Sequence, residues 1–590
     1  MLELRLRKWP SLAFLIGAAL LSWPRPLAAL VFDQVIVFGD STVDSGFYRA
    51  LPNPGGNATF NADWPAAVGA GAGIPTSSPG PMYSQLLASY FGLTANPANQ
   101  GGTNFATSGA KNVDVNTSQN GGFGAAIPTV TQIANYLTAV ANQADPNALY
   151  LISSGNNDIK FALGLTGTGP FPGDPNAYMV SRANSLAAAI ASLKAAGAQT
   201  FIVSQLTASF PTNSPTEQQL RATYNQALAA ALAGQGVTVT FADINSVRLA
   251  ILASPAQFGF TTISNATGNS ACVQPGGGIT TAWALLCSSS ASAPSKFVSA
   301  NADMTRLFAD DEHLATAGQK IVANYIYSLI PPPASSPLVA AVLPASRSVQ
   351  VANPATAFAS IVNSSNATAS NCQISPVSNV NGRFAYQTTD PATNQLTGTA
   401  NTPVSIPAGQ SQTFLLAFTP TAPFVSADVQ FVYVCTGMPS VVPIVGINSL
   451  RLTFDANPVP DMIAIGLTSP NDGYAHTGGV GGTGIFAVAA VNIGVTANLT
   501  ARLRVLDPAT PLTALLCETF SSGPTAGQCK ATQSATVNRT VNQNETTTWT
   551  AFVTSTGPIA QDAAHNRIFF EFIDGGGVVR GSTSTAVTTN

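Results

Sequence analysis

The chain has 590 residues, of which 45% are hydrophobic and only 8% are charged, and its formal net charge is −3. A chain of this length exceeds what one hydrophobic core supports, so we expect several domains. The low charge and the lack of a Lys/Arg cluster exclude a nucleic-acid-binding protein. The high apolar content excludes an intrinsically disordered one.

The first 29 residues have the pattern of an export signal. Three basic residues within the first eight positions precede the apolar run 11–21, and Ala28 and Ala29 follow it. A charged start, a short apolar run and small residues are typical of a secretory signal peptide. The run is shorter than the roughly 20 residues that a membrane helix needs. We therefore predict a secreted or extracellular protein (or a periplasmic or cell-surface one) with no membrane span.

Residues 30–332 alternate short apolar runs with helical stretches. Apolar runs predict strands at 35–38, 102–106, 148–153, 200–205 and 237–243. Helical spacing or Ala/Leu-rich composition predicts helices at 128–142, 177–196, 216–233 and 315–329. This alternation predicts an α/β domain with a parallel sheet covered on both faces. The segments 49–80 and 254–300 interrupt the pattern, and we expect them to be irregular insertions that shape a binding site.

A Pro-rich linker at 333–337 separates this domain from a β-rich half. Beyond it, short runs rich in Val, Thr and Phe alternate with Gly/Pro/Asn turns, which predicts β-sandwiches. A weak internal repeat, in which Phe358–Asn363 echoes Phe486–Asn492, has an offset of about 130 residues, a usual size for one sandwich. We predict two Ig-like modules, 338–453 and 454–590. One larger β-domain is the alternative.

The six cysteines fall into three pairs, each inside one predicted domain. An even number of cysteines in an exported protein indicates disulfides, whereas a metal site would need CxxC spacing or nearby histidines. The sequence does not prove which cysteines are bonded to each other. The candidate pairs are Cys272 with Cys287, Cys372 with Cys435, and Cys517 with Cys529.

A candidate nucleophile and its base stand at the two ends of the α/β domain. Ser41 follows the apolar run 35–38 after Gly39 and Asp40, so its hydroxyl is expected at the carboxyl edge of the sheet, where ligands bind. His313 is the only histidine of 30–332, and Asp310 precedes it by three residues. A serine nucleophile needs a base and an acid that orients the base. His313 and Asp310 fit these roles.

Several acidic residues are alternatives to these assignments or neighbours of them. Asp303 and Asp311 are rival orienting groups, but their spacing to His313 fits less well. Asp40, Asp44 and Asp158 are expected to be structural and to bond turn amides around the site.

Two loops could donate hydrogen bonds to an oxyanion, which needs donors placed before the charge develops. Gly109 follows the second predicted strand, and a glycine lets its backbone N–H approach a ligand without a Cβ in the way. Asn157 follows the third predicted strand and carries an amide side chain. Gly and Asn are also common in ordinary turns, so neither residue indicates a site alone.

These short motifs occur in a particular order: Gly39-Asp40-Ser41, the glycine loop at 109, Gly155-Asn156-Asn157-Asp158, and Asp310 with His313. In this order they resemble the GDSL (SGNH) hydrolase family of esterases and lipases, over about 30–330. The resemblance implies a flavodoxin-like three-layer α/β/α fold and a triad of Ser41, Asp310 and His313. It also implies an oxyanion hole made of the Ser41 N–H, the Gly109 N–H and the Asn157 side chain.

The chain departs from the family pattern at two positions. Thr42 stands where the family has Leu, and Leu314 follows the histidine where the family usually has Pro. Neither side chain takes part in the chemistry, so these changes bear on turn geometry more than on activity.

The sequence thus predicts a secreted serine esterase or lipase that hydrolyses carboxylic esters through an acyl-enzyme. A lipid, an acylated polysaccharide or a polyester would suit as substrate. No Gly-x-Ser-x-Gly elbow, Gly-rich phosphate loop or metal-binding cluster occurs in the sequence, so we expect no cofactor and no metal. The alternative is a surface binding or adhesion protein whose β-modules bind a polysaccharide or another surface ligand.

Overall fold

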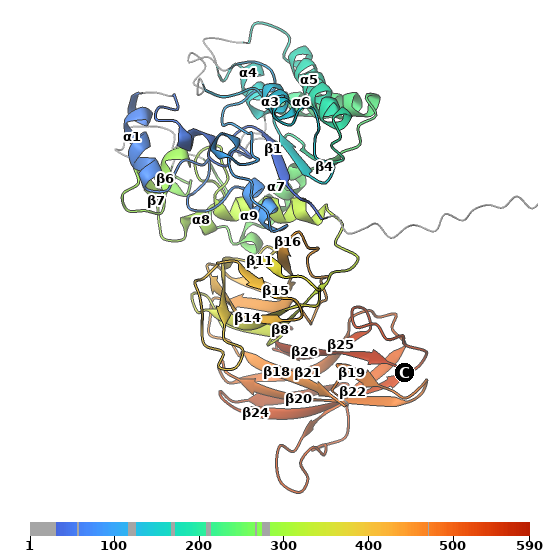
Figure 1. The fold of residues 1–590 in the computed structure, drawn as a ribbon. Coiled ribbons are helices and arrows are strands. Elements are labelled where there is room, and N and C mark those ends of the chain that lie inside the picture. Colours follow the sequence, from blue (N-terminus) through green and yellow to red (C-terminus); the bar gives the residue numbers. More distant parts are fainter. Residues whose placement is uncertain are drawn as a thin grey trace, which may run out of the picture.

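The computed structural model describes residues 31–55, 58–115, 125–166, 171–207, 214–265, 268–273, 284–469 and 471–590. The predicted signal peptide, 1–29, lies outside these residues. Figure 1 shows a part with helices and strands followed by two groups of β-sheets, in chain order. Within the described ranges, no helix is both long enough and apolar enough to cross a bilayer.

The first part is built on a parallel sheet in the order β1-β2-β3-β4. Its strands are β1 (Val35–Gly39), β2 (Leu149–Ser153), β3 (Thr200–Ser204) and β4 (Thr240–Ala242). All residues of β1 and β2 are buried. Strands buried on both faces need helices on both sides, which explains why their sequences are continuous apolar runs.

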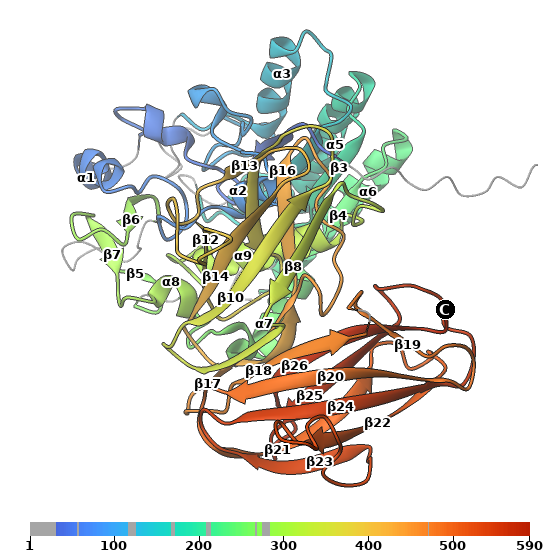
Figure 2. The same ribbon diagram turned by 60° about the horizontal axis from the view of Figure 1, so that its bottom comes forward.

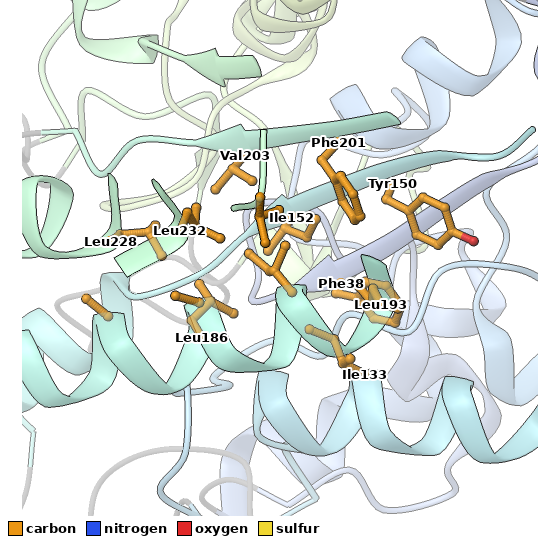
Figure 3. Close-up of a cluster of buried hydrophobic side chains, with 14 of the residues drawn as sticks. Phe38, Ile133, Tyr150, Ile152, Leu186, Leu193, Phe201, Val203, Leu228 and Leu232 are labelled. Carbon is orange, nitrogen blue, oxygen red and sulfur yellow. The ribbon is translucent and has the colours of Figure 1, made fainter. Parts of the chain in front are cut away.

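Alternate residues of each strand enter two separate apolar cores. Ile36 and Phe38 of β1 join one core with residues of the helices α3 (Thr129–Ala139), α5 (Pro175–Ala195) and α6 (Pro215–Gly234). Figure 3 shows this core. Val35 and Val37 join the other core with residues of α2 (Tyr83–Ser89) and α9 (Thr316–Ser328). The domain therefore has three layers, α/β/α, and the predicted fold class is confirmed.

The remaining helices of this part are short or lie at its edges. They are α1 (Ala58–Gly69), α4 (Asn156–Ala162), α7 (Ile244–Ala253) and α8 (Ala302–Thr305).

Local structure differs from expectation in two segments. The predicted strand 102–106 forms only isolated parallel bridges, from Asn104 to Val37 and to Pro97, because the Asn104 side chain accepts the N–H of Ala106 and turns the chain. The segment 49–80, expected to be irregular, contains α1 despite Pro65 in its middle. Phe60 and Trp64 of α1 are buried in an apolar cluster, so tertiary packing stabilises a helix that local propensity disfavours.

The first group of sheets follows the linker and has its own apolar core. Its strands are β8 (Leu338–Leu343), β9 (Ser346–Gln350), β10 (Ala355–Asn363), β11 (Ala369–Pro376), β12 (Gly382–Thr389), β13 (Val404–Ile406), β14 (Ser411–Pro420), β15 (Phe424–Val429), β16 (Phe431–Thr436) and β17 (Leu450–Asp455). They form the sheets β12-β14-β10-β8, β13-β11-β16 and β15-β17-β9.

The second group has another core and two larger sheets, β18-β20-β24-β22 and β19-β26-β25-β21-β23. Its strands are β18 (Met462–Thr468), β19 (Tyr474–His476), β20 (Thr483–Asn492), β21 (Ala497–Val505), β22 (Leu512–Thr519), β23 (Thr536–Val541), β24 (Thr546–Ser555), β25 (Arg567–Ile573) and β26 (Val579–Thr588).

The two groups share a pattern that matches the repeat in the sequence. β10 lies between β14 and β8, and β20 lies between β24 and β18. Each of these central strands ends in a buried asparagine, Asn363 or Asn492, whose side-chain amide donates to nearby backbone carbonyls. Figure 2 shows both four-stranded sheets turned toward the viewer.

Candidate active site

The turn that carries Ser41 is fixed at its start by Gly39. This glycine has a φ of +148°, and a Cβ on it would lie 1.9 Å from the backbone carbonyl oxygen of Ser153, so only glycine fits. The side chain of Gln132 accepts the Gly39 N–H at 2.8 Å and donates to the Gly39 carbonyl at 2.9 Å. Ser41 follows two residues later and is half-buried. The Ser41 hydroxyl therefore lies at the carboxyl edge of the parallel sheet.

Asp40 and Thr42 hold the turn on either side of the serine. Asp40 Oδ1 accepts the Thr42 N–H at 2.9 Å and the Thr42 hydroxyl at 2.7 Å. Thr42 Oγ1 also lies 2.8 Å from Ser153 Oγ on β2. A leucine at position 42 could make neither side-chain bond. Burial raises the pKa of Asp40, and the hydrogen bonds from Thr42 oppose this rise.

His313 and Asp310 are in direct contact. His313 Nδ1 lies 2.8 Å from Asp310 Oδ2 and 3.0 Å from Oδ1. The Asp310 side chain is only 3% exposed, and that of His313 is 18% exposed. A carboxylate can only accept hydrogen bonds, so Nδ1 carries the proton and Nε2 is left as the acceptor. This is the tautomer that a general base for a serine requires.

The charges around His313 favour its protonated form. Burial alone would lower the pKa of His313, but the charge and hydrogen bond of Asp310 outweigh burial and raise this pKa to about 9. The charge of Glu312 adds to the rise, and that of Lys160 opposes it. For Asp310, burial raises the pKa, but the neighbouring His313 and the backbone donors lower it overall.

Three backbone amides fix the Asp310 carboxylate. Oδ1 accepts the N–H groups of Glu312 at 2.9 Å and of His313 at 2.7 Å, which is the bonding of an Asx turn. Oδ2 accepts the N–H of Ala284 at 2.8 Å. Ala284 lies 26 residues earlier in the chain, in the second insertion.

The two segments that carry the predicted oxyanion donors are in contact with each other. Gly109 has a φ of +83°, in the left-handed region that favours glycine. The Asn157 side chain, in the first turn of α4, donates to the carbonyl of Ala110 at 2.9 Å, so its amide lies beside the glycine loop.

Further bonds connect these loops to the turn of Ser41. Asp44 accepts the N–H and the hydroxyl of Ser108 at 2.8 and 2.7 Å, which connects the serine turn to the glycine loop. Asn156 Nδ2 lies 3.4 Å from Asp40 Oδ2 and brings the start of α4 to the same turn. Lys160 of α4 forms an ion pair with Glu312, at 2.5 Å, next to His313. All four motif segments are therefore connected to one another.

Asp303 and Asp158, two of the other acidic residues, bond to groups other than His313. Asp303 forms an ion pair with Arg383 of β12, with its Oδ1 2.6 Å from Nη2. For Asp311, burial and the neighbouring acids raise the pKa to about 6. Asp158 accepts the Asn112 N–H at 2.9 Å and so holds the end of the glycine loop.

Sequence reasoning missed four contributors: Thr42 as a bonding residue, Gln132, the Ala284 amide, and the Lys160–Glu312 pair. The Thr42 hydroxyl, next to an aspartate in a turn, was a signal that could have been used. The other three are contacts between segments distant in sequence, for which the chain carries no local signal.

The three cysteine pairs expected from the sequence are disulfides in the structure: Cys272–Cys287, Cys372–Cys435 and Cys517–Cys529. Among the residues that the structure describes, no group of three or more His, Cys, Asp or Glu side chains could hold a metal ion.

Comparison with known proteins gives matches to esterases and lipases. Esterase EstA of Pseudomonas aeruginosa is 29% identical over 363 residues, which are 56% of this chain and 51% of that protein. Lipase 1 of Photorhabdus luminescens is 29% identical over 154 residues, 26% of this chain and 20% of that protein. The chain thus spans about half the length of the esterase and a fifth of the lipase.

Among solved structures, an acetyl xylan esterase from Geobacillus stearothermophilus matches at 14% identity over 50% of this chain and 94% of that chain, with a TM-score of 0.25. This score is too low to support an argument about substrate. The model of the GDSL-like lipase/acylhydrolase family matches residues 35–326, which include every motif segment described above. Residues 35–326 therefore form a domain of the GDSL-like lipase/acylhydrolase family.

Proposed function

We propose that this protein is an exported serine esterase or lipase in which Ser41 attacks the carbonyl carbon of a carboxylic ester. The observation that carries the proposal is the buried Asp310–His313 pair, whose tautomer leaves Nε2 as a proton acceptor. The segments with Ser41, Gly109 and Asn157 are bonded to one another and to the loop of His313. Such a constellation suits acyl transfer.

The first half of the reaction forms an acyl-enzyme. As Ser41 Oγ bonds to the ester carbon, its proton passes to His313 Nε2, and Asp310 stabilises the imidazolium. The carbonyl oxygen becomes an oxyanion that accepts hydrogen bonds from the Ser41 N–H, the Gly109 N–H and the Asn157 amide. Collapse of this intermediate breaks the ester bond, and the alcohol leaves with the proton from His313.

In the second half, His313 takes a proton from water, which attacks the acyl carbon. A second oxyanion forms in the same place, and its collapse releases the acid and returns the proton to Ser41. Asn157 has two amide hydrogens. One binds the Ala110 carbonyl, which orients the amide, and the other serves the oxyanion in this scheme.

Export and the substrate class are part of the proposal. The three disulfides support a protein that works in an oxidising compartment, extracellular, periplasmic or at the cell surface. Lipids, acylated polysaccharides and polyesters are the candidate substrates. A panel of nitrophenyl esters of increasing acyl length, followed by phospholipid, acetylated xylan and a polyester, would rank them.

Replacement of the nucleophile tests the proposal. Ser41→Ala should reduce hydrolysis of short nitrophenyl esters by at least about a thousandfold, because no other group supplies the attacking oxygen. Ser185→Ala, on the exposed face of α5, is the matched control and should retain full activity. If Ser41→Ala hydrolyses esters as fast as the unchanged chain, the assignment is wrong.

A further inference from the structure

One side of the Asp310 carboxylate is closed by a segment that a disulfide holds in place. Asp310 Oδ2, the oxygen nearest to His313 Nδ1, also accepts the N–H of Ala284 at 2.8 Å. Ala284 begins the short 3₁₀ helix Ala284–Leu286, and Cys287 follows this helix directly. The amide that touches the carboxylate is thus three residues from a disulfide cysteine.

The other cysteine lies against the loop of Asp310. The N–H of Cys272 donates to the carbonyl of Ala309 at 3.1 Å, and the N–H of Ala271 donates to that of Phe308 at 2.7 Å. The Cys272–Cys287 bond therefore joins the short strand β5 (Cys272–Val273), which follows the backbone bonds to Phe308 and Ala309, to the segment whose amide contacts Asp310. The disulfide is thus a covalent link between the two segments that border Asp310.

Because Asp310 and the Ala284 segment are buried, the Asp310 carboxylate depends on the hydrogen bonds that the protein donates to it. Ala284 is 1% exposed, Cys287 0% and Asp310 2%. An ionised carboxylate in such a place needs its hydrogen-bond donors, because water does not replace them. Among the residues that the structure describes, the Ala284 N–H is one of three backbone donors to Asp310 and the only one from outside its own turn.

The other contacts of the Ala284 segment run in two directions. Ala284 itself packs in a small apolar cluster with Ala271 and Ala309, beside Asp310. Leu285 and Leu286 pack in the apolar cluster with Phe60 and Trp64 of α1. Ser288 Oγ donates to the carbonyl of Ala70 at 2.7 Å. The contacts with Phe60, Trp64 and Ala70 hold the segment on the first insertion. The disulfide, the alanine cluster and shared pairing with β7 (Ser295–Phe297) hold it to the strand beside Asp310.

We propose that the Cys272–Cys287 disulfide is a positioning element of the triad, which holds the Ala284 amide against Asp310 and so keeps the carboxylate aligned with His313. This inference rests on the proposed esterase function. It implies that the chain reaches full activity only after oxidation of these two thiols. A dithiol that opens the bond gives two electrons and two protons to the cysteines and itself becomes a disulfide, and activity should then fall.

Two variants remove the same interaction by different routes. Cys272→Ala with Cys287→Ala removes the covalent link, and Ala284→Pro removes the N–H but keeps the disulfide. Proline is tolerated at the first position of a helix, where no intrahelical bond is lost. Because a misaligned carboxylate weakens the base and not substrate binding, each variant should lower kcat about tenfold with an unchanged KM.

The measurements are made per active site, counted by titration with a fluorophosphonate. A purely structural role would lower the number of titratable sites and leave kcat per site unchanged. The matched control is Cys517→Ala with Cys529→Ala, which removes a disulfide of the second β-sheet group and should leave kcat and KM unchanged.

Combination of the two variants decides whether the disulfide acts through Ala284. If it does, the triple variant should lose no more kcat than either parent, because the same interaction is already absent. The inference would be overturned if the losses of kcat in the two variants multiplied in the triple variant. It would also be overturned by an unchanged kcat per site in Ala284→Pro, a result that can be read even if the cysteine variant does not fold. If the unchanged chain has neither esterase activity nor a titratable serine, the proposed function itself fails.

Discussion

At the scale of single residues, the protonation of His313 controls the proposed reaction. The neutral imidazole is the active form, since only it can accept the Ser41 proton. Asp310 raises the pKa of His313 to about 9 against the effect of burial. A raised pKa extends the inactive, protonated form to higher pH, so activity should increase with pH in the alkaline range.

The pH profile of kcat/KM tests this control. Its acid limb should have a midpoint near pH 9, well above the usual 6.5 of histidine. In Asp310→Asn the anion that stabilises the imidazolium is gone, so the limb should move to lower pH while kcat falls about a hundredfold or more. An acid limb near 6.5 in the unchanged chain would contradict this account of the charges.

At the scale of secondary structure elements, α4 and the loop of His313 are joined by the Lys160–Glu312 pair. Both side chains are partly exposed, at 29% and 45%, so the pair itself contributes at most about 1 kcal/mol to stability. Its larger effect is on His313, whose pKa is raised by Glu312 and lowered by Lys160. The pair thus modifies the pKa of His313 and connects the loop of His313 to the helix that carries Asn157.

Removal of the Glu312 charge and removal of the Lys160 charge should shift the acid limb of the pH profile in opposite directions. Glu312→Gln should lower the pKa of His313 and move the acid limb to lower pH, whereas Lys160→Met should move it to higher pH. Both shifts should shrink at high salt, because exposed charges are screened. Lys194→Met, an exposed lysine of α5, is the control and should leave the limb in place. Shifts of the same sign in the two variants would show that the pair acts by another route.

The elements near the sheet could largely be predicted from the sequence. Buried parallel strands require continuous apolar runs, and those of β1, β2 and β3 stand out against the polar turns around them. His313 could be recognised as a candidate because no other histidine occurs before the linker, and Asp310 because a spacing of three residues allows contact within one turn.

Contacts made across long sequence separations could not be predicted. The Ala284 N–H is a backbone group, and its approach to Asp310 depends on how the second insertion folds. Helix α1 forms around Pro65 because its apolar face packs on Leu285 and Leu286, residues more than 200 positions later. Such features follow from tertiary packing, which overrides local propensity.

At the scale of the whole molecule, the first group of β-sheets packs on the helices that flank His313. Arg383 of β12 pairs with buried Asp303 of α8, which precedes the histidine loop. Asn379 accepts a hydrogen bond from Asn324 of α9, the helix after that loop, at 2.8 Å. Val432 of β16 enters the apolar core that α2 and α9 share with the parallel sheet. These sheets thus brace the catalytic domain.

Loss of Arg383 should weaken this brace. Arg383→Ala leaves the Asp303 carboxylate buried without its cation, which should destabilise the protein by about 1–3 kcal/mol, since the arginine is partly exposed. Urea unfolding measures the change, and protease cleavage near the 333–337 linker should become faster. Lys530→Ala, which removes an exposed cation from Glu518 but leaves Arg539 paired with that carboxylate, is the control with an expected cost below about 1 kcal/mol. Equal stability of both variants would contradict a bracing role.

The whole account depends on Ser41 being a nucleophile activated by His313. Reaction of the full chain with a fluorophosphonate, followed by peptide mass spectrometry, measures this directly. We expect one adduct per chain, on Ser41, which is absent in Ser41→Ala and forms at least about a hundredfold more slowly in His313→Ala. No adduct, or an adduct on another residue in a chain that hydrolyses esters, would contradict the account.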